Sequence, residues 1–99
     1  MAHRVAPRAS DDLDDIWSYI ANQSGSLEIA DRLIHSITDR FSLLADFPQL
    51  GRSRVEDLGV GMRSHVVGDY VIIYSMDGGD VLILRVVHGR RDLESIFGD

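Results

Sequence analysis

The chain has 99 residues, of which 44% are hydrophobic and 26% are charged, and its formal net charge is −6. This length suits one domain over residues 1–99, and the balanced composition excludes disordered, collagen-like and coiled-coil classes. The absence of cysteine excludes disulfide scaffolds, thiolate metal sites and cysteine nucleophiles. No leader pattern and no run of about 18 apolar residues is present, so we expect a cytoplasmic protein without a membrane partner.

The first 26 residues predict a short strand and a helix. Residues 2–7 are typical of a strand that ends at Pro7, because proline cannot donate to a central ladder. Ser10, followed by two aspartates, is typical of a helix N-cap. The helix then extends to about Asn22, and its buried face follows a helical spacing with Leu13, Ile16, Trp17 and Ile20.

A second helix is predicted from the cap residue Ser26 to about Asp46, before Pro48. Its apolar stripe consists of Ala30, Leu33, Ile34, Ile37, Phe41 and Leu44. Two helices joined by about four residues form an antiparallel hairpin. We expect Trp17 and Ile20 of the first helix and Phe41 and Leu44 of the second to lie in the core.

The second half of the chain predicts three strands after a loop at 51–61. The strands cover about 62–67, 70–76 and 80–88, and tight turns at 68–69 and 77–79 join them. The fold class is therefore α+β, with two layers in the order β-α-α-β-β-β. A helical hairpin packs on a mainly antiparallel four-stranded sheet.

The last strand is apolar on both faces if it alternates regularly. One face then carries Val81, Ile83, Arg85 and Val87, and the other carries Leu82, Leu84, Val86 and His88. Two helices cover only one face, so we expect the face with Arg85 to present valine and isoleucine to a protein partner. The alternative is that the twisted sheet and the carboxyl-terminal tail cover this patch internally.

All ten basic residues are arginine, which binds carboxylates and phosphates in a bidentate manner but cannot act as a general base. Six of the ten follow residue 50, namely Arg52, Arg54, Arg63, Arg85, Arg90 and Arg91. The negative net charge argues against a general affinity for polyanions, so we expect no direct sequence-specific binding of nucleic acid. The four histidines have no metal-ligand spacing, and we expect neither a metal nor a cofactor.

Four stretches of the sequence resemble the ParE branch of the RelE/ParE toxins of bacterial toxin–antitoxin modules. They are ASDDLDDIWSYIA at 9–21, FPQLGRSR at 47–54, GMRSHVVGDYVIIY at 61–74 and RVVHGRRDL at 85–93. The resemblance implies a cytoplasmic toxin held inactive in a hetero-oligomer by a ParD-like antitoxin. The antitoxin's disordered segment would fold against the apolar sheet face and the helical hairpin.

The two branches of these toxins share a fold but differ in their target. Members of the ParE branch poison DNA gyrase by stalling it on cleaved DNA, whereas the RelE branch cleaves messenger RNA in the ribosomal A site. Function must therefore be argued from the site. A third interpretation, a solitary module that binds a small ligand, lacks convergent polar pocket residues.

Metal-free RNA cleavage needs an acid or base and cations around the phosphate. The candidates are His88 as acid or base, with Arg63, Arg85, Arg90 and Arg91 as phosphate clamps. The RelE branch relies on several lysines, or on a Glu, Arg, His and Tyr set, but this chain has no lysine. Gly-Arg-Arg-Asp follows His88 where that tyrosine is expected. The resemblance thus favours a ParE toxin that acts by binding, without catalysis of its own.

We expect the target contacts to come from Arg63, Arg85, His88, Arg90 and Arg91. Arg63 shares a strand face with His65 and is expected near Arg85. Two arginines that lie close together typically bind an anion or an acidic partner. The alternative for His88 is that it is a histidine at a strand end whose hydrogen bonds are made within the protein. The alternative for Arg90 and Arg91 is that they form weak ion pairs on the surface.

Arg52 and Arg54 also allow two interpretations. They either anchor the loop at 51–61 to Glu56, to Asp57 or to a helix carboxyl end, or they contact the target.

Overall fold

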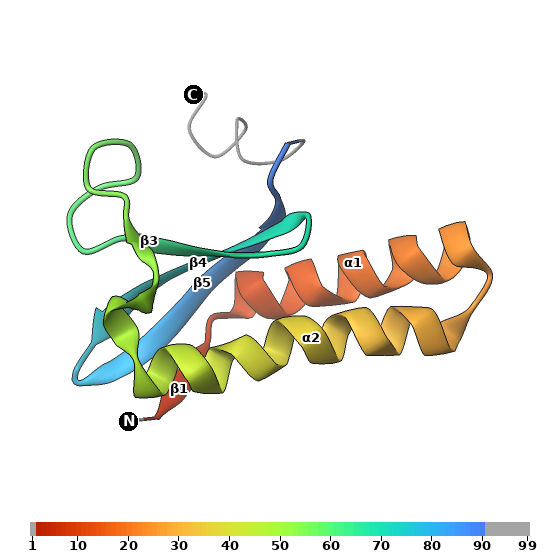
Figure 1. The fold of residues 1–99 in the computed structure, drawn as a ribbon, viewed down its shortest axis with the longest axis horizontal. Helices are drawn as coiled ribbons and strands as arrows, with labels where there is room; N and C mark the ends of the chain where they lie inside the picture. The colour runs from red at the N-terminus through yellow and green to blue at the C-terminus, as the bar shows by residue number, and fades with distance from the viewer. Residues whose placement is uncertain (1, 91–99) are drawn as a thin grey trace.

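A helical hairpin lies on one face of a twisted five-stranded sheet in the computed structural model, which describes residues 2–90 (Figure 1). The elements are β1 (His3–Val5), α1 (Pro7–Ser24), α2 (Leu27–Asp46), the 3-10 turn η1 (Pro48–Leu50), β2 (Arg52–Ser53), β3 (Arg63–Val67), β4 (Tyr70–Asp77) and β5 (Asp80–His88). The sheet order is β1-β5-β4-β3-β2, and only the β1–β5 pair is parallel. The predicted fold class is confirmed, with β2 as an additional short strand inside the expected loop.

Helix α1 begins at Pro7, so the prediction that Ser10 is its N-cap is wrong. Ala6 occupies the cap position, and the amide of Ser10 already donates to the Ala6 carbonyl at 3.1 Å. Proline suits the first helical position because its fixed φ is helical and the missing N–H would have no partner there. The strand accordingly ends at Val5, and the two aspartates after Ser10 lie beyond the first turn.

The connection between the helices matches the prediction closely. Helix α1 extends two residues past Asn22 and ends where Gly25 adopts a left-handed conformation with φ of 68°. The Ser26 side chain caps α2 by accepting from the amide of Ile29 at 3.2 Å. Within residues 2–90, no helix is long and apolar enough to cross a bilayer.

The helices bury one face of the sheet. The main core contains Ala9, Ile16, Ile37, Phe41, Leu44, Val67, Tyr70, Ile72, Tyr74, Val81, Ile83 and Val86, and Leu13, Ile20, Leu33 and Ile34 pack against it. The predicted core positions of Ile20, Phe41 and Leu44 are confirmed. Trp17 is instead half-buried, and its indole N–H donates to Asp31 at 2.7 Å, which ties α1 to α2.

Strand β5 contains a β-bulge. Ile73 of β4 pairs with Arg85, whereas the next residue, Tyr74, pairs with Ile83. Leu84 is therefore an extra residue on β5. A bulge shifts the alternation of all side chains that follow it, so the two halves of β5 do not share one register.

The bulge overturns the predicted faces of the last strand. Val86 joins Val81 and Ile83 in the core beneath the helices, and Val87 lies on the opposite side of the sheet. That opposite side is not an open apolar face either, because Leu58 and Met62 of the connecting loop pack over it. The second cluster that they cover consists of Val71, Ile73 and Val87, which are at most 6% exposed. The expected partner surface on the sheet is thus filled by the chain itself.

A buried tyrosine fixes the turn after α2. The Tyr74 hydroxyl accepts from the amide of Gly51 and donates to the carbonyl of Pro48, both at 2.8 Å. Arg63 donates to the carbonyls of Gln49 and Gly51, the former at 3.1 Å. This network holds η1 and the start of β2 against the sheet. A Cβ atom on Gly51 would clash with the Tyr74 hydroxyl and would lie 2.8 Å from the Ser64 carbonyl.

We predict that Gly51→Ala lowers the free energy of unfolding by about 1–3 kcal/mol, the usual cost of an added methyl group in a packed site. Urea denaturation followed by circular dichroism measures the change, and Ser53→Ala at an exposed position of β2 is the control. Equal stability of the two variants would contradict this account of the turn.

Candidate functional site

The end of β5 carries a histidine and an exposed arginine side by side. The His88 ring is half-buried and stands edge-on to Tyr70, with the ring centroids 5.5 Å apart. The amide of Arg90 donates to Nδ1 of His88 at 3.2 Å, and the amide of Gly89 donates to the carbonyl of Asp69 at 2.8 Å. These bonds fix the direction in which the chain leaves the sheet and leave the Arg90 side chain exposed.

Arg85 is held by an acidic residue of α1. Its Nε and Nη2 atoms donate to the two carboxylate oxygens of Asp12 at 2.8 and 3.0 Å. The same carboxylate accepts from the backbone amide of Val86 at 2.9 Å. The Arg85 and Asp12 side chains are 26% and 15% exposed, so this ion pair is partly shielded from water.

Arg63 is engaged at a different place. Its Nη2 atom donates to two carbonyls of the turn after α2, and its Nε atom is buried without a hydrogen-bond partner. Strand β4 separates Arg63 on β3 from Arg85 on β5. The two arginines therefore do not come together around a shared anion, contrary to the expectation from the sequence.

Of the five expected contact residues, the structure brings only His88 and Arg90 together. Arg63 and Arg85 have internal partners, and Arg91 lies outside the described residues. The trio His88, Arg85 and Arg63 required by the ribonuclease alternative is thus distributed over separate partners. Within residues 2–90, no group of three potential metal ligands is present.

Asp12 is the site residue whose role the sequence analysis missed. In the sequence it stands two residues after the predicted cap Ser10, where a carboxylate is expected only to favour the helix dipole. Its position three residues after Ala9 and four before Ile16, both buried, places it on the buried face of α1. A carboxylate on such a face needs a cation or several hydrogen bonds, and this signal was available in the sequence.

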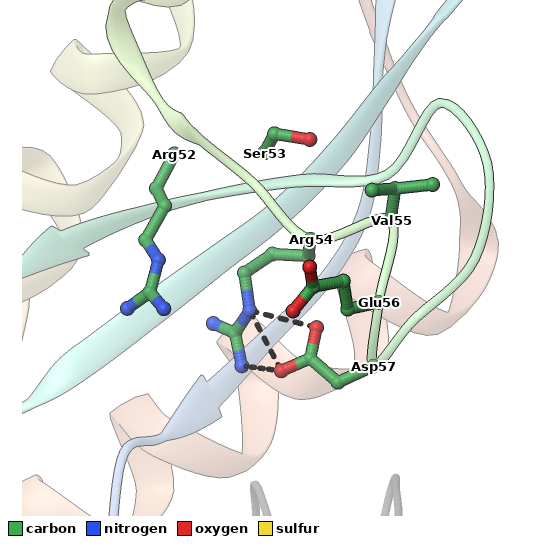
Figure 2. Close-up of a pocket in the computed structure, with 6 residues that line it drawn as sticks. All are labelled: Arg52, Ser53, Arg54, Val55, Glu56 and Asp57. Atoms are coloured by element: carbon green, nitrogen blue, oxygen red, sulfur yellow. Dashed lines mark hydrogen bonds and ion pairs between the residues drawn. The ribbon is translucent and has the colours of Figure 1, made fainter.

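The loop after β2 forms a hollow of about 320 Å³ on the side of the sheet away from the helices (Figure 2). Arg54 lines the hollow and donates to both carboxylate oxygens of Asp57, with a shortest distance of 2.7 Å. It also donates to Ser64 at 3.0 Å. The pair with Asp57 confirms that Arg54 anchors the loop. The hydrogen bonds from Arg54 hold the pKa of Asp57 below its usual value, and the charge of nearby Arg52 adds to this effect.

A second basic pair joins α2 to β3. The Nη1 atom of Arg40 lies 3.2 Å from Nε2 of His65. Burial lowers the pKa of His65, and the positive charge of Arg40 lowers it further. Because a guanidinium can only donate, Nε2 of His65 is the acceptor in this contact, and a neutral ring provides that acceptor.

Comparison with known proteins connects this arrangement to a family. Residues 4–93 match the family described as the ParE toxin of the type II toxin–antitoxin system parDE. This chain belongs to the ParE toxin family. It is a ParE-type toxin of a type II toxin–antitoxin system, and the resemblance seen in the sequence is confirmed.

Two curated ParE toxins of Caulobacter vibrioides are similar over most of their length. Toxin ParE3 is 35% identical over 89 residues, which cover 90% of this chain and 87% of ParE3. Toxin ParE1 is 34% identical over 96 residues, which cover 97% of each chain.

Solved structures of both branches share the ParE fold. The chromosomal ParDE system of P. aeruginosa matches with a TM-score of 0.77 at 21% identity, over 89% of this chain and 95% of the other. The RelBE2 toxin–antitoxin complex of Mycobacterium tuberculosis matches with a TM-score of 0.57 at 25% identity, over 88% and 95%. The fold is therefore common to both branches and does not by itself choose a target.

We predict that Arg40→Gln raises the pKa of His65, because the change removes a neighbouring positive charge while the ring stays equally buried. An NMR titration of the histidine ring protons measures it, with Arg32→Gln on the same helix as the control.

The pKa of His65 in the folded ParE toxin lies below the value of about 6.5 of an unfolded chain. Its contribution to stability is therefore present above this pH and is lost as the pH falls through the folded pKa. A His65 titration that is identical in both variants would contradict the assigned cause.

Proposed function

We propose that this ParE toxin inhibits DNA gyrase by direct protein contact in the cytoplasm, and that a ParD-like antitoxin neutralises it in a hetero-oligomer. The family match over residues 4–93 and the relation to two curated ParE toxins support the ParE branch. The resemblance to this branch implies gyrase as the target. The mechanism needs no cofactor, because the toxin acts by stalling an enzyme that itself cleaves DNA.

The observation that carries the choice of mechanism is the ion pair between Arg85 and Asp12. A phosphate clamp in a ribonuclease needs a guanidinium directed at the substrate, but two donor atoms of Arg85 bind a carboxylate of α1. His88 rests against Tyr70, and its Nδ1 atom accepts from the amide of Arg90. This arrangement supports binding over RNA cleavage.

The surface that we assign to the target lies where β5 leaves the sheet. His88 and Arg90 present their side chains there, and Arg91 is the next residue in the sequence. Arginine side chains of this kind suit an acidic protein surface, since they form bidentate bonds with carboxylates. Arg63 and Arg85 support this surface from within the protein. Arg63 binds the turn after α2, and Arg85 binds Asp12 of α1.

The surface that we assign to the antitoxin lies on the helical hairpin. The hairpin exposes Tyr19, Leu27 and Ile29 near its distal end, at 45%, 62% and 48% of their surface. An amphipathic segment of an antitoxin buries such side chains when it folds on binding. The structures of similar fold are described as a ParDE toxin–antitoxin system and a RelBE2 toxin–antitoxin complex, which supports a partner of this kind.

Two purified assays test the proposed target. The toxin is added to gyrase with supercoiled and relaxed DNA, and separately to ribosomes programmed with a messenger RNA. Inhibited supercoiling together with trapped cleaved DNA is the expected result. Cleavage of the messenger in the A site, without an effect on gyrase, would replace the proposal with the RelE alternative.

We predict that the double change Arg90→Ala and Arg91→Ala reduces growth arrest without unfolding the domain. Each lost hydrogen bond to a charged group costs about 1.5–3 kcal/mol, so the affinity for the target falls at least about a hundredfold. Gyrase inhibition by the purified variant measures the loss.

A matched control carries Arg8→Ala and Arg32→Ala, which remove the same charge from exposed positions of the two helices. The control is expected to inhibit gyrase like the unchanged toxin. Unchanged inhibition by a stable Arg90 and Arg91 double variant would exclude these residues from the site.

A further inference from the structure

Strand β5 continues beyond the point at which its neighbour β1 ends. Strand β1 pairs with β5 from His3 opposite Val81 as far as Val5 opposite Ile83. The amide of Ala6 makes a further bond to the Ile83 carbonyl at 2.8 Å. The chain then turns into α1. Beyond this point no residue of β1 pairs with β5, and the amide of Val86 donates to Asp12 instead.

Asp12 therefore takes the place of a neighbouring strand. Its carboxylate accepts three bonds from two consecutive residues of β5, at 2.8 and 3.0 Å from Arg85 and at 2.9 Å from Val86. Arg85 also balances the charge of the carboxylate, whose side chain is only 15% exposed. Bidentate charge-assisted bonds of this kind fix orientation more strongly than bonds between neutral groups.

These bonds hold the strand at its bulge. Leu84 is the extra residue of β5, and Arg85 and Val86 follow it directly. A bulge is the point at which a strand bends and changes the direction of the following side chains. His88 comes three residues after Arg85, and Arg90 comes five residues after it, so both lie immediately downstream of this fixed bend.

We propose that Asp12 is a positioning residue for the target surface: it holds the β5 bulge through Arg85 and Val86 and so sets the positions of His88 and Arg90 at the end of the strand. This inference rests on the proposed function, because it assigns the contact with gyrase to the end of β5. Asp12 itself touches no target. Its effect passes through the backbone of β5.

The change Asp12→Asn tests this role. Asparagine has nearly the same volume and keeps one acceptor for the Val86 amide, but it loses the charge and the paired acceptors for Arg85. Asp14→Asn is the matched control, because Asp14 lies on the same helix with an exposed side chain. Both variants change the net charge equally.

Two measurements separate positioning from a loss of folding. The first is hydrogen exchange of the amides of Val86, His88 and Arg90, which we expect to accelerate about tenfold or more in Asp12→Asn, while the amides of β4 stay protected. The second is gyrase inhibition at a temperature at which circular dichroism shows both variants fully folded. We expect about a tenfold higher inhibitory concentration for Asp12→Asn and no change for Asp14→Asn.

Other outcomes overturn the inference. Unchanged exchange at all three amides, those of Val86, His88 and Arg90, would show that Asp12 does not hold the strand end. Accelerated exchange with unchanged inhibition by a fully folded Asp12→Asn variant would restrict Asp12 to a role in stability. If Asp12→Asn does not fold, Arg85→Lys provides the same readouts, since lysine keeps the ion pair but loses the two-donor geometry, and intermediate effects are then expected.

The two proposals can fail independently. If the unchanged toxin does not inhibit gyrase, the proposed function is wrong. The exchange rates of Val86, His88 and Arg90 still report whether Asp12 orders the end of β5.

Discussion

The parallel pairing of the first and last strands is the constraint on which this molecule depends. Strand β1 is only three residues long, and Pro7 starts a helix almost immediately after it. Helix α1 must therefore run beside β5, and the edge of β5 that β1 leaves uncovered needs another hydrogen-bond acceptor. Asp12 supplies that acceptor, and the positive charge of Arg85 offsets the cost of partly burying the carboxylate.

Local sequence signals predicted most of this architecture correctly. The apolar spacing of the helices, the cap at Ser26 and the two tight turns of the meander all depend on residues that are close in the sequence. The start of α1 was misassigned because two local signals competed, and the proline prevailed over Ser10. Strand β2 was missed because two residues are too few to show an alternation.

The faces of β5 were not predictable from alternation alone. The bulge at Leu84 coincides with contacts to a helix more than seventy residues earlier in the chain, and no pattern within the strand announces it. The sequence predicted which residue types make up the site but not how their side chains are arranged. The sequence shows many arginines in the second half, but only the fold shows that Arg63 and Arg85 have internal partners while Arg90 is exposed.

The register between β1 and β5 also has a consequence for synthesis on the ribosome. Residues 3–5 are made first, but they find their partners only when residues 81–83 have emerged. Until then, only the residues of β3 and β4 are available to cover the apolar faces of the helices, and the nascent chain is exposed to aggregation or to capture by other proteins. The end of β5 that we assign to the target follows residues 81–83 directly in the sequence, so the chain completes its sheet and its contact surface at nearly the same stage of translation.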